Sequence, residues 1–211
     1  PEPDRGGGEP LRDIEQRKRM RRGAQIASLL RQRYGKDRVG AVVSRYDARA
    51  EIGQEDIERV VRDLASAAGG LTIVVNNAGT GKSAPFAKTT RSLWDEMLAL
   101  DLTSAFTVTQ LALPHLLAAG HGRIVNVASM AGLKGYPYIA AYCAAKHGLV
   151  GFTRALAVEL AGKKITVNAV CPGYVDSQMT AVNIEIMSQK TKRPADSIRN
   201  EIEAMSPQHR L

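Results

Sequence analysis

The sequence predicts a single α/β domain in which helices cover both faces of a parallel sheet, giving three layers. Two observations support this fold class. Short, uninterrupted apolar runs are typical of parallel strands that are buried on both faces. They alternate along the chain with longer segments whose apolar residues recur at helical spacing. The length of 211 residues and the hydrophobic fraction of 44% fit one globular domain spanning residues 1–211.

The predicted elements follow one another as strands and helices in turn. Residues 1–10, rich in glycine and proline, are expected to form a loose end before a helix at 11–33. The predicted strands are the apolar runs 38–43, 71–75, 123–127 and 165–170. The helices after them are predicted at 54–68, 90–119 and 142–161. The polar residues 176–205 are expected to form a helical region in two pieces.

Composition argues against several classes of protein. No apolar run approaches about 18 uninterrupted residues and residues 1–5 do not open a signal peptide, so we expect a cytoplasmic protein without membrane contact. Cys143 and Cys171 form no CxxC pair, which argues against a disulfide scaffold and a zinc site. Most of the net charge of +8 lies in residues 1–50. A solvated helix face explains this charge better than a nucleic-acid arm, because no aromatic residues interleave with it.

The residues after the predicted strand 71–75 partly match a phosphate-binding loop. Gly81, Lys82 and Ser83 supply the end of the pattern G-x4-G-K-[ST]. Asn76, however, stands where the first glycine is required, and Pro85 falls where the following helix should run. An ATPase is therefore not predicted.

A second candidate site lies at the start of the helix 142–161. Tyr142 and Lys146 are four residues apart and therefore share one helix face, and Ser129 ends the preceding strand. The ordinary pKa of tyrosine, about 10, is too high for acid–base chemistry at neutral pH. A neighbouring ammonium group lowers it, and a serine hydroxyl can hold a substrate oxygen in place. A Tyr-x3-Lys pair alone is more often an ordinary helix surface.

Four motifs together resemble the short-chain dehydrogenase/reductase family. They are Asn76-Asn77-Ala78-Gly79 and residues 122–129, 142–146 and 167–173, in the family's order and spacing. The resemblance covers about residues 38–211 and implies a Rossmann-type fold that binds NAD or NADP. It also implies an oxidoreductase that interconverts a secondary alcohol and a ketone by hydride transfer. Residues 144–153 and 171–175 look most like those of 3-hydroxybutyrate dehydrogenases and 3-oxoacyl- or acetoacetyl-thioester reductases.

The resemblance implies a role for each candidate residue. Tyr142 would be the general acid/base, Lys146 would lower its pKa and bind the nicotinamide ribose, and Ser129 would hold the substrate oxygen. Further cofactor contacts are expected at Asp47, beside the adenine, and at Asn76, Asn77, Ala78, Gly79, Pro172, Gly173 and Val175. No metal is implied. Residues 176–205 would form the substrate loop, and the two long helices would pair subunits as a homodimer or homotetramer.

One departure from the family pattern concerns the long central helix. The family carries an asparagine there that helps to hold a water of the proton relay, and this chain has Asp101 instead. We count Asp101 among the catalytic residues. An anion near Lys146 would partly cancel its effect on Tyr142, which predicts a higher tyrosine pKa and an alkaline optimum for oxidation. The alternative is an ordinary exposed aspartate.

A second departure concerns the two ends of the domain. Family members open with a strand and a turn T-G-x-x-x-G-x-G that binds pyrophosphate at a helix N-terminus, and this sequence has no such segment. It also stops before the family's last strand. We therefore expect a domain without its first βαβ edge and last strand: a fragment, a partly ordered chain or a degenerate paralogue. Such a chain would bind dinucleotide weakly or not at all, and the alternative function is a non-catalytic relative that acts through subunit association.

Overall fold

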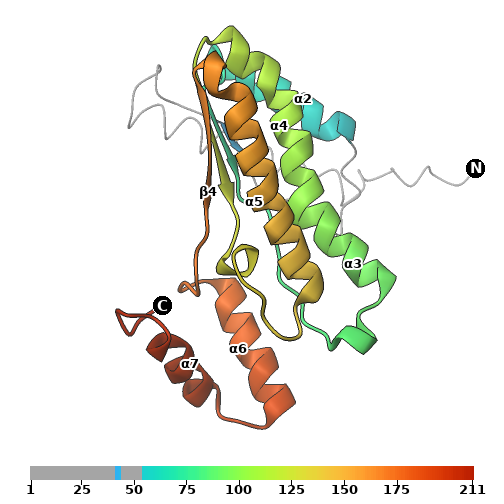
Figure 1. Ribbon diagram of the computed structural model, residues 1–211, viewed down its shortest axis with the longest axis vertical. Helices are drawn as coiled ribbons and strands as arrows, with labels where there is room; N and C mark the ends of the chain where they lie inside the picture. Colours follow the sequence, from blue (N-terminus) through green and yellow to red (C-terminus); the bar gives the residue numbers. More distant parts are fainter. Residues whose placement is uncertain (1–40, 44–53) are drawn as a thin grey trace, which may run out of the picture.

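The computed structural model describes residues 41–43 and 54–211 and contains a four-stranded parallel sheet (Figure 1). The strands are β1 (Ala41–Val43), β2 (Ile73–Asn76), β3 (Gly122–Val127) and β4 (Ile165–Val170). They lie side by side in the order β1-β2-β3-β4, and every neighbouring pair is parallel. The predicted parallel α/β sheet is therefore confirmed. The loose end and helix expected within residues 1–33 lie outside the described residues.

Helices connect the strands, as the alternation predicts. α2 (Gln54–Ala68) joins β1 to β2 with the predicted bounds, and α5 (Ala140–Leu160) joins β3 to β4. The predicted helix at 90–119 is three segments: α3 (Arg91–Leu98), a π-helical turn η3 (Ala99–Thr103) and α4 (Ser104–Ala118). Short 3-10 turns are η2 (Phe86–Lys88), η4 (Met130–Gly132) and η5 (Ala161–Lys163). The long helix thus has an irregular turn at its centre.

Residues 176–205 form the two helical pieces that the sequence predicts. α6 (Gln178–Thr191) begins after Ser177, whose side chain accepts a hydrogen bond from the Thr180 backbone N–H. α7 (Ala195–Ala204) follows, and the two helices share a small core formed by Ile184, Ile198 and Ile202. In Figure 1 they lie beyond the end of β4, below the other helices.

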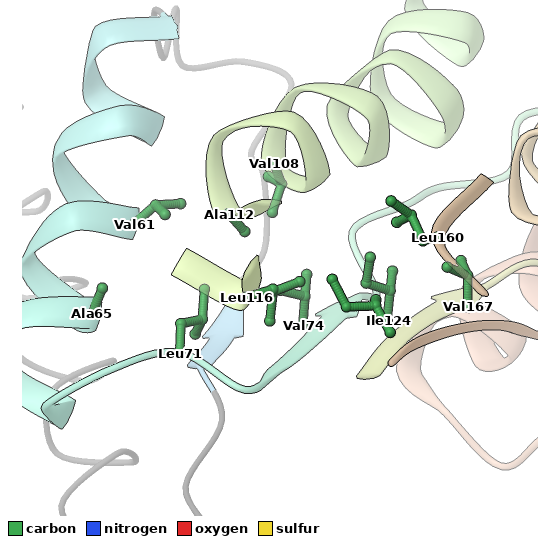
Figure 2. Close-up of a cluster of buried hydrophobic side chains, with 11 residues drawn as sticks. Val61, Ala65, Leu71, Val74, Val108, Ala112, Leu116, Ile124, Leu160 and Val167 are labelled. Atoms are coloured by element: carbon green, nitrogen blue, oxygen red, sulfur yellow. The ribbon is translucent and has the colours of Figure 1, made fainter. Parts of the chain in front are cut away.

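The main core lies between the sheet and the helices α2, α4 and α5 (Figure 2). Leu116, Ile124 and Ile165 are almost completely buried there. Along β4, Ile165 and Val167 are buried whereas Thr166 and Asn168 are exposed. The described residues thus supply the sheet and one helical layer. The predicted layer on the other face lies outside the described residues.

One helical segment of the described chain, Arg91–Ala118, is long and apolar enough to cross a membrane by length and composition alone. The structure packs it against the sheet instead. Met97, Leu100 and Leu116 of this segment are at most 3% exposed. One face of the segment therefore packs in the core.

The parallel order brings the predicted site together at one edge of the sheet. In the register, Asn76 pairs with Asn126, and Asn126 pairs with Ala169. The residues that follow β2, β3 and β4 consequently lie next to one another. Ligands of open parallel α/β sheets bind at this edge, beyond the carboxyl ends of the strands.

Candidate active site

Ser129 is placed by the turn that follows β3. Its hydroxyl caps η4 by accepting a hydrogen bond from the Ala131 N–H at 3.1 Å, and it lies close enough to the phenol of Tyr142 to lower the pKa of that group. The turn packs closely on α5 because residue 132 is glycine. A Cβ atom at Gly132 would lie only 2.7 Å from the backbone oxygen of Lys146. The loop therefore folds back onto α5 and brings Ser129 to Tyr142.

Tyr142 and Lys146 stand one turn apart on α5, near its beginning. Lys146 is 4% exposed, and its Nζ donates a hydrogen bond to the Val127 carbonyl at 3.0 Å. The same atom lies 5.7 Å from the centre of the Tyr142 ring. The structure thus brings the three residues Ser129, Tyr142 and Lys146 into one constellation.

Asp101 is the fourth member of this constellation. Its side chain is completely buried, so the alternative of an exposed helical aspartate is wrong. Oδ1 lies 3.2 Å from Lys146 Nζ and accepts a hydrogen bond from the Thr80 N–H at 3.2 Å. Oδ2 is buried without a hydrogen-bond partner among the described residues. Burial raises the pKa of the Asp101 carboxyl to about 6, although Lys146 and the Thr80 N–H oppose the shift.

The pKa of Tyr142 is raised above its ordinary value of 10.0, chiefly by burial. The nearby Ser129 hydroxyl lowers the pKa, whereas the charge of Asp101 and the thiol of Cys143 raise it further. Lys146, which is paired with Asp101, is not among these main causes. The direction is the one that we expected from an aspartate at position 101, and it is opposite to the effect expected from Lys146 alone.

The loop after β2 meets the constellation at Gly79. A Cβ atom there would lie 2.5 Å from Asp101 Oδ1 and 3.2 Å from Lys146 Nζ, so the close approach requires glycine. Asn77 is exposed and Ala78 is half-buried beside it. Asn76 is different, because its amide Nδ2 donates to Asn126 and Thr109 inside the fold. Asn76 therefore supports from the interior the loop that is expected to shape the cofactor cleft.

The loop after β4 reaches the same place. The Met130 N–H donates a hydrogen bond to the Pro172 carbonyl at 2.9 Å, which ties this loop to the turn that carries Ser129. A Cβ atom at Gly173 would lie 3.1 Å from the Met130 side chain, and Val175 is half exposed. These predicted cofactor residues are thus at the expected edge. Asp47, expected near the adenine, lies outside the described residues.

The described residues fit the ribose and nicotinamide part of a dinucleotide. The Lys146 ammonium has three N–H donors, and the contacts with Val127 and Asp101 leave one for a ribose hydroxyl. Gly79 lets the backbone of its loop pass close to this ammonium group. No group of three or more His, Cys, Asp or Glu side chains in the described parts of the chain is arranged to hold a metal ion.

A buried polar network behind the site was missed by the sequence analysis. Asn126 Nδ2 donates to Thr153 Oγ1 at 2.8 Å, and Thr153 Oγ1 donates to the Leu149 carbonyl at 2.7 Å. Through Asn76 the network joins β2, β3 and α5. The available signal was an asparagine in the middle of the apolar strand 122–127, because a buried amide must find partners.

We expect Thr153→Val to reduce the free energy of unfolding by about 1–3 kcal/mol. The substitution keeps the side-chain shape but leaves the buried amide of Asn126 without its acceptor. Urea denaturation measures the change. Thr166→Val, on the exposed face of β4, is the matched control and is expected to change stability by less than about 0.5 kcal/mol. Equal losses in the two variants would contradict a structural role for the network.

Comparisons with known proteins point to one family. Residues 17–187 match the model of the family described as short chain dehydrogenase. The chain is 42% identical over 147 residues to D-beta-hydroxybutyrate dehydrogenase of Cupriavidus necator, covering 70% of this chain and 57% of that protein. It is 37% identical over 158 residues to acetoacetyl-CoA reductase of Allochromatium vinosum, covering 74% of this chain and 59% of that protein. The chain thus spans less than two thirds of each relative.

A solved structure shows the same fold. A single-residue variant of the actinorhodin polyketide ketoreductase, crystallised with NADPH, matches with a TM-score of 0.72 and 38% identity. The match covers 78% of this chain and 63% of the ketoreductase. The Rossmann-type fold expected from the sequence is therefore confirmed. The family match over most of the sequence and this shared fold establish that the chain belongs to the short-chain dehydrogenase/reductase family.

Proposed function

We propose that the chain acts as an NAD(P)-dependent oxidoreductase that interconverts a secondary alcohol and a ketone. The observation that carries the proposal is the convergence of three side chains: the Ser129 hydroxyl lies close enough to the phenol of Tyr142 to lower its pKa, and the buried Lys146 stands one turn away on α5. In the proposed reaction, Tyr142 would serve as the proton donor, Ser129 as the hydroxyl that binds the substrate oxygen and Lys146 as the cation beside them. The bound nicotinamide cofactor would supply or accept the hydride.

The residues of the chain would move the proton. In reduction, the phenol of Tyr142 donates its proton to the carbonyl oxygen of the substrate, which the Ser129 hydroxyl holds in place. In oxidation, the phenolate of Tyr142 takes the proton of the alcohol. The remaining N–H of Lys146 would bind the ribose and fix the nicotinamide beside Tyr142.

We propose a 3-hydroxyacyl or 3-oxoacyl compound as the substrate class. The likeness to D-beta-hydroxybutyrate dehydrogenase and acetoacetyl-CoA reductase supports this choice. Residues 176–205, with α6 and α7 joined by their own small core, would cover the substrate. A small-molecule substrate of this kind also fits the cytoplasmic location that we propose.

The test of this function uses the 211-residue chain with acetoacetyl-CoA and D-3-hydroxybutyrate, each assayed with both nicotinamide cofactors at millimolar concentration. Fluorescence titration with NADH and NADPH measures binding separately. We expect cofactor oxidation with acetoacetyl-CoA. Binding of a cofactor with turnover of 2-butanone but of neither acyl substrate would contradict the substrate class. Absence of cofactor binding and of turnover would contradict the oxidoreductase function of this chain.

A second function, subunit association, is favoured by aromatic residues on the outer side of α4 and α5. Phe106 is 46% exposed and lies edge-to-face with Phe152, with 6.3 Å between the ring centres. Leu117 and Val158 add exposed apolar surface on the same two helices. We propose that this surface pairs two copies of the chain as a homodimer, or as part of a homotetramer.

Phe106→Glu is expected to shift the chain from dimer or tetramer to monomer, because it places a charge in the apolar interface. Light scattering coupled to size-exclusion chromatography measures the molar mass. Phe86→Glu is the matched control, since Phe86 is 80% exposed and belongs to η2 rather than to α4 or α5, and the mass should not change. A monomeric wild type, or equal behaviour of the two variants, would contradict the proposed interface.

A further inference from the structure

The buried carboxylate of Asp101 is not accounted for by the proton transfer proposed for Tyr142. Asp101 belongs to the π-helical turn η3, and its side chain is completely buried. Its Oδ2 has no hydrogen-bond partner among the described residues. Burying a carboxylate with one oxygen unsatisfied is unfavourable. π-helical turns in long helices are frequently found at functional sites. Both features point to a role for Asp101 beyond packing.

The contacts of Lys146 show which group the carboxylate acts on. Nζ lies 3.2 Å from Asp101 Oδ1 and 3.0 Å from the Val127 carbonyl oxygen, but 5.7 Å from the centre of the Tyr142 ring. Two of the three N–H groups are therefore engaged by partners other than the phenol. The paired carboxylate also neutralises the positive charge of the ammonium group.

Because the Asp101 carboxylate offsets the charge of the Lys146 ammonium, Lys146 stabilises the phenolate of Tyr142 less than it would alone. An ammonium group alone stabilises a nearby phenolate, and an adjacent carboxylate opposes this effect. Consistently, the charge of Asp101 raises the pKa of Tyr142 in addition to the effect of burial. Two further titratable groups act on these residues: Glu96 on α3, which is paired with Lys82, raises the pKa of Asp101, and the Cys143 thiol raises the pKa of Tyr142.

We propose that Asp101 is a positioning residue that holds Lys146, keeps Tyr142 in its protonated form and thereby biases the site toward ketone reduction near neutral pH. The inference rests on the proposed acid/base function of Tyr142. Reduction begins with the protonated phenol, whereas oxidation begins with the phenolate. A group that disfavours phenolate therefore supports reduction and confines oxidation to alkaline pH.

The test measures the ionisation of Tyr142 directly. Tyrosines labelled with carbon-13 at Cζ are titrated by NMR in the wild-type chain and in Asp101→Asn, and Tyr142→Phe identifies the signal. Asparagine keeps the side-chain shape and an oxygen acceptor for the Thr80 N–H, but it removes the charge. Asp95→Asn is the matched control, because Asp95 lies on the exposed side of α3 in an ion pair with Arg91.

We expect Tyr142 to be half-ionised in Asp101→Asn at a pH about one unit lower than in the wild type. In Asp95→Asn the midpoint should not move. An unchanged midpoint in folded Asp101→Asn would overturn the proposal, as would a Tyr142 that stays protonated in both proteins until they unfold. Should Asp101→Asn lose its circular dichroism spectrum, Asp101→Ser removes the same charge and is judged by the same midpoint.

The titration needs neither cofactor nor turnover, so its outcome is separate from that of the activity assay. A chain without activity contradicts the proposed function but still reports the midpoint of Tyr142. In the active enzyme, the pH profile of kcat/KM for oxidation should move about one unit toward acid in Asp101→Asn. A merely structural role of Asp101 would lower kcat/KM at every pH without moving the profile.

Discussion

Replacing Tyr142 by phenylalanine is expected to lower kcat for ketone reduction by about 10²–10⁴-fold. The substitution removes the phenol oxygen, beside Ser129, that would carry the proton. The ring remains between its neighbours on α5, so we expect KM for the substrate to change little. Steady-state kinetics with acetoacetyl-CoA over a range of concentrations separate kcat from KM.

The matched control is Tyr138→Phe. Tyr138 lies four residues earlier, in the loop before α5, and its side chain is 65% exposed. We expect kcat to stay within about twofold of the wild type. A Tyr142→Phe variant that keeps more than a tenth of the wild-type kcat would exclude the phenol as the proton donor.

Replacing Gly132 by alanine is expected to reduce the free energy of unfolding by about 1–3 kcal/mol and to lower activity at the same time. The added Cβ atom would lie 2.7 Å from the Lys146 carbonyl oxygen and 2.9 Å from its carbonyl carbon. These are backbone atoms within a helix, so the turn η4 must move instead. Its movement would separate Ser129 from Tyr142.

Gly135→Ala provides the comparison for this substitution. Gly135 lies in the same loop, and an added Cβ atom would meet nothing within 4 Å. The free energy of unfolding should stay the same or rise slightly, because alanine restricts the unfolded chain. Chemical denaturation measures both variants. Equal destabilisation would show that the loop does not depend on the close approach at Gly132.

Much of this fold follows from the periodicity of the sequence. The bounds of α2 agree with the predicted helix 54–68 because Gly69 and Gly70, both at positive φ, end it abruptly. β4 also has its predicted bounds, since a polar turn precedes Ile165. Ser129, Tyr142 and Lys146 were identified from motif spacing, and the structure brings them together. Local signals were sufficient for the bounds of α2 and β4 because each is set by its immediate neighbours.

Other features depend on contacts that local patterns do not contain. A π-helical turn differs from α-helix by one residue within an unbroken helical pattern, so η3 could not be located from apolar spacing. The burial of Asp101 follows from that turn together with the close passage of Gly79. The inward orientation of Asn76 likewise depends on Asn126 and Thr109, which are distant in the sequence.

The π-helical turn also sets the angular phase between α3 and α4. Each residue advances an α-helix by about 100° around its axis, so one additional residue rotates everything that follows by about that angle. With η3 present, Met97 before the turn and Leu116 after it are both fully buried, while Asp101 meets Lys146. Removing a single residue from Ala99–Thr103 would make the helix regular and turn one of these faces to solvent. The length of this turn therefore couples the packing of the core to the charge balance of the active site.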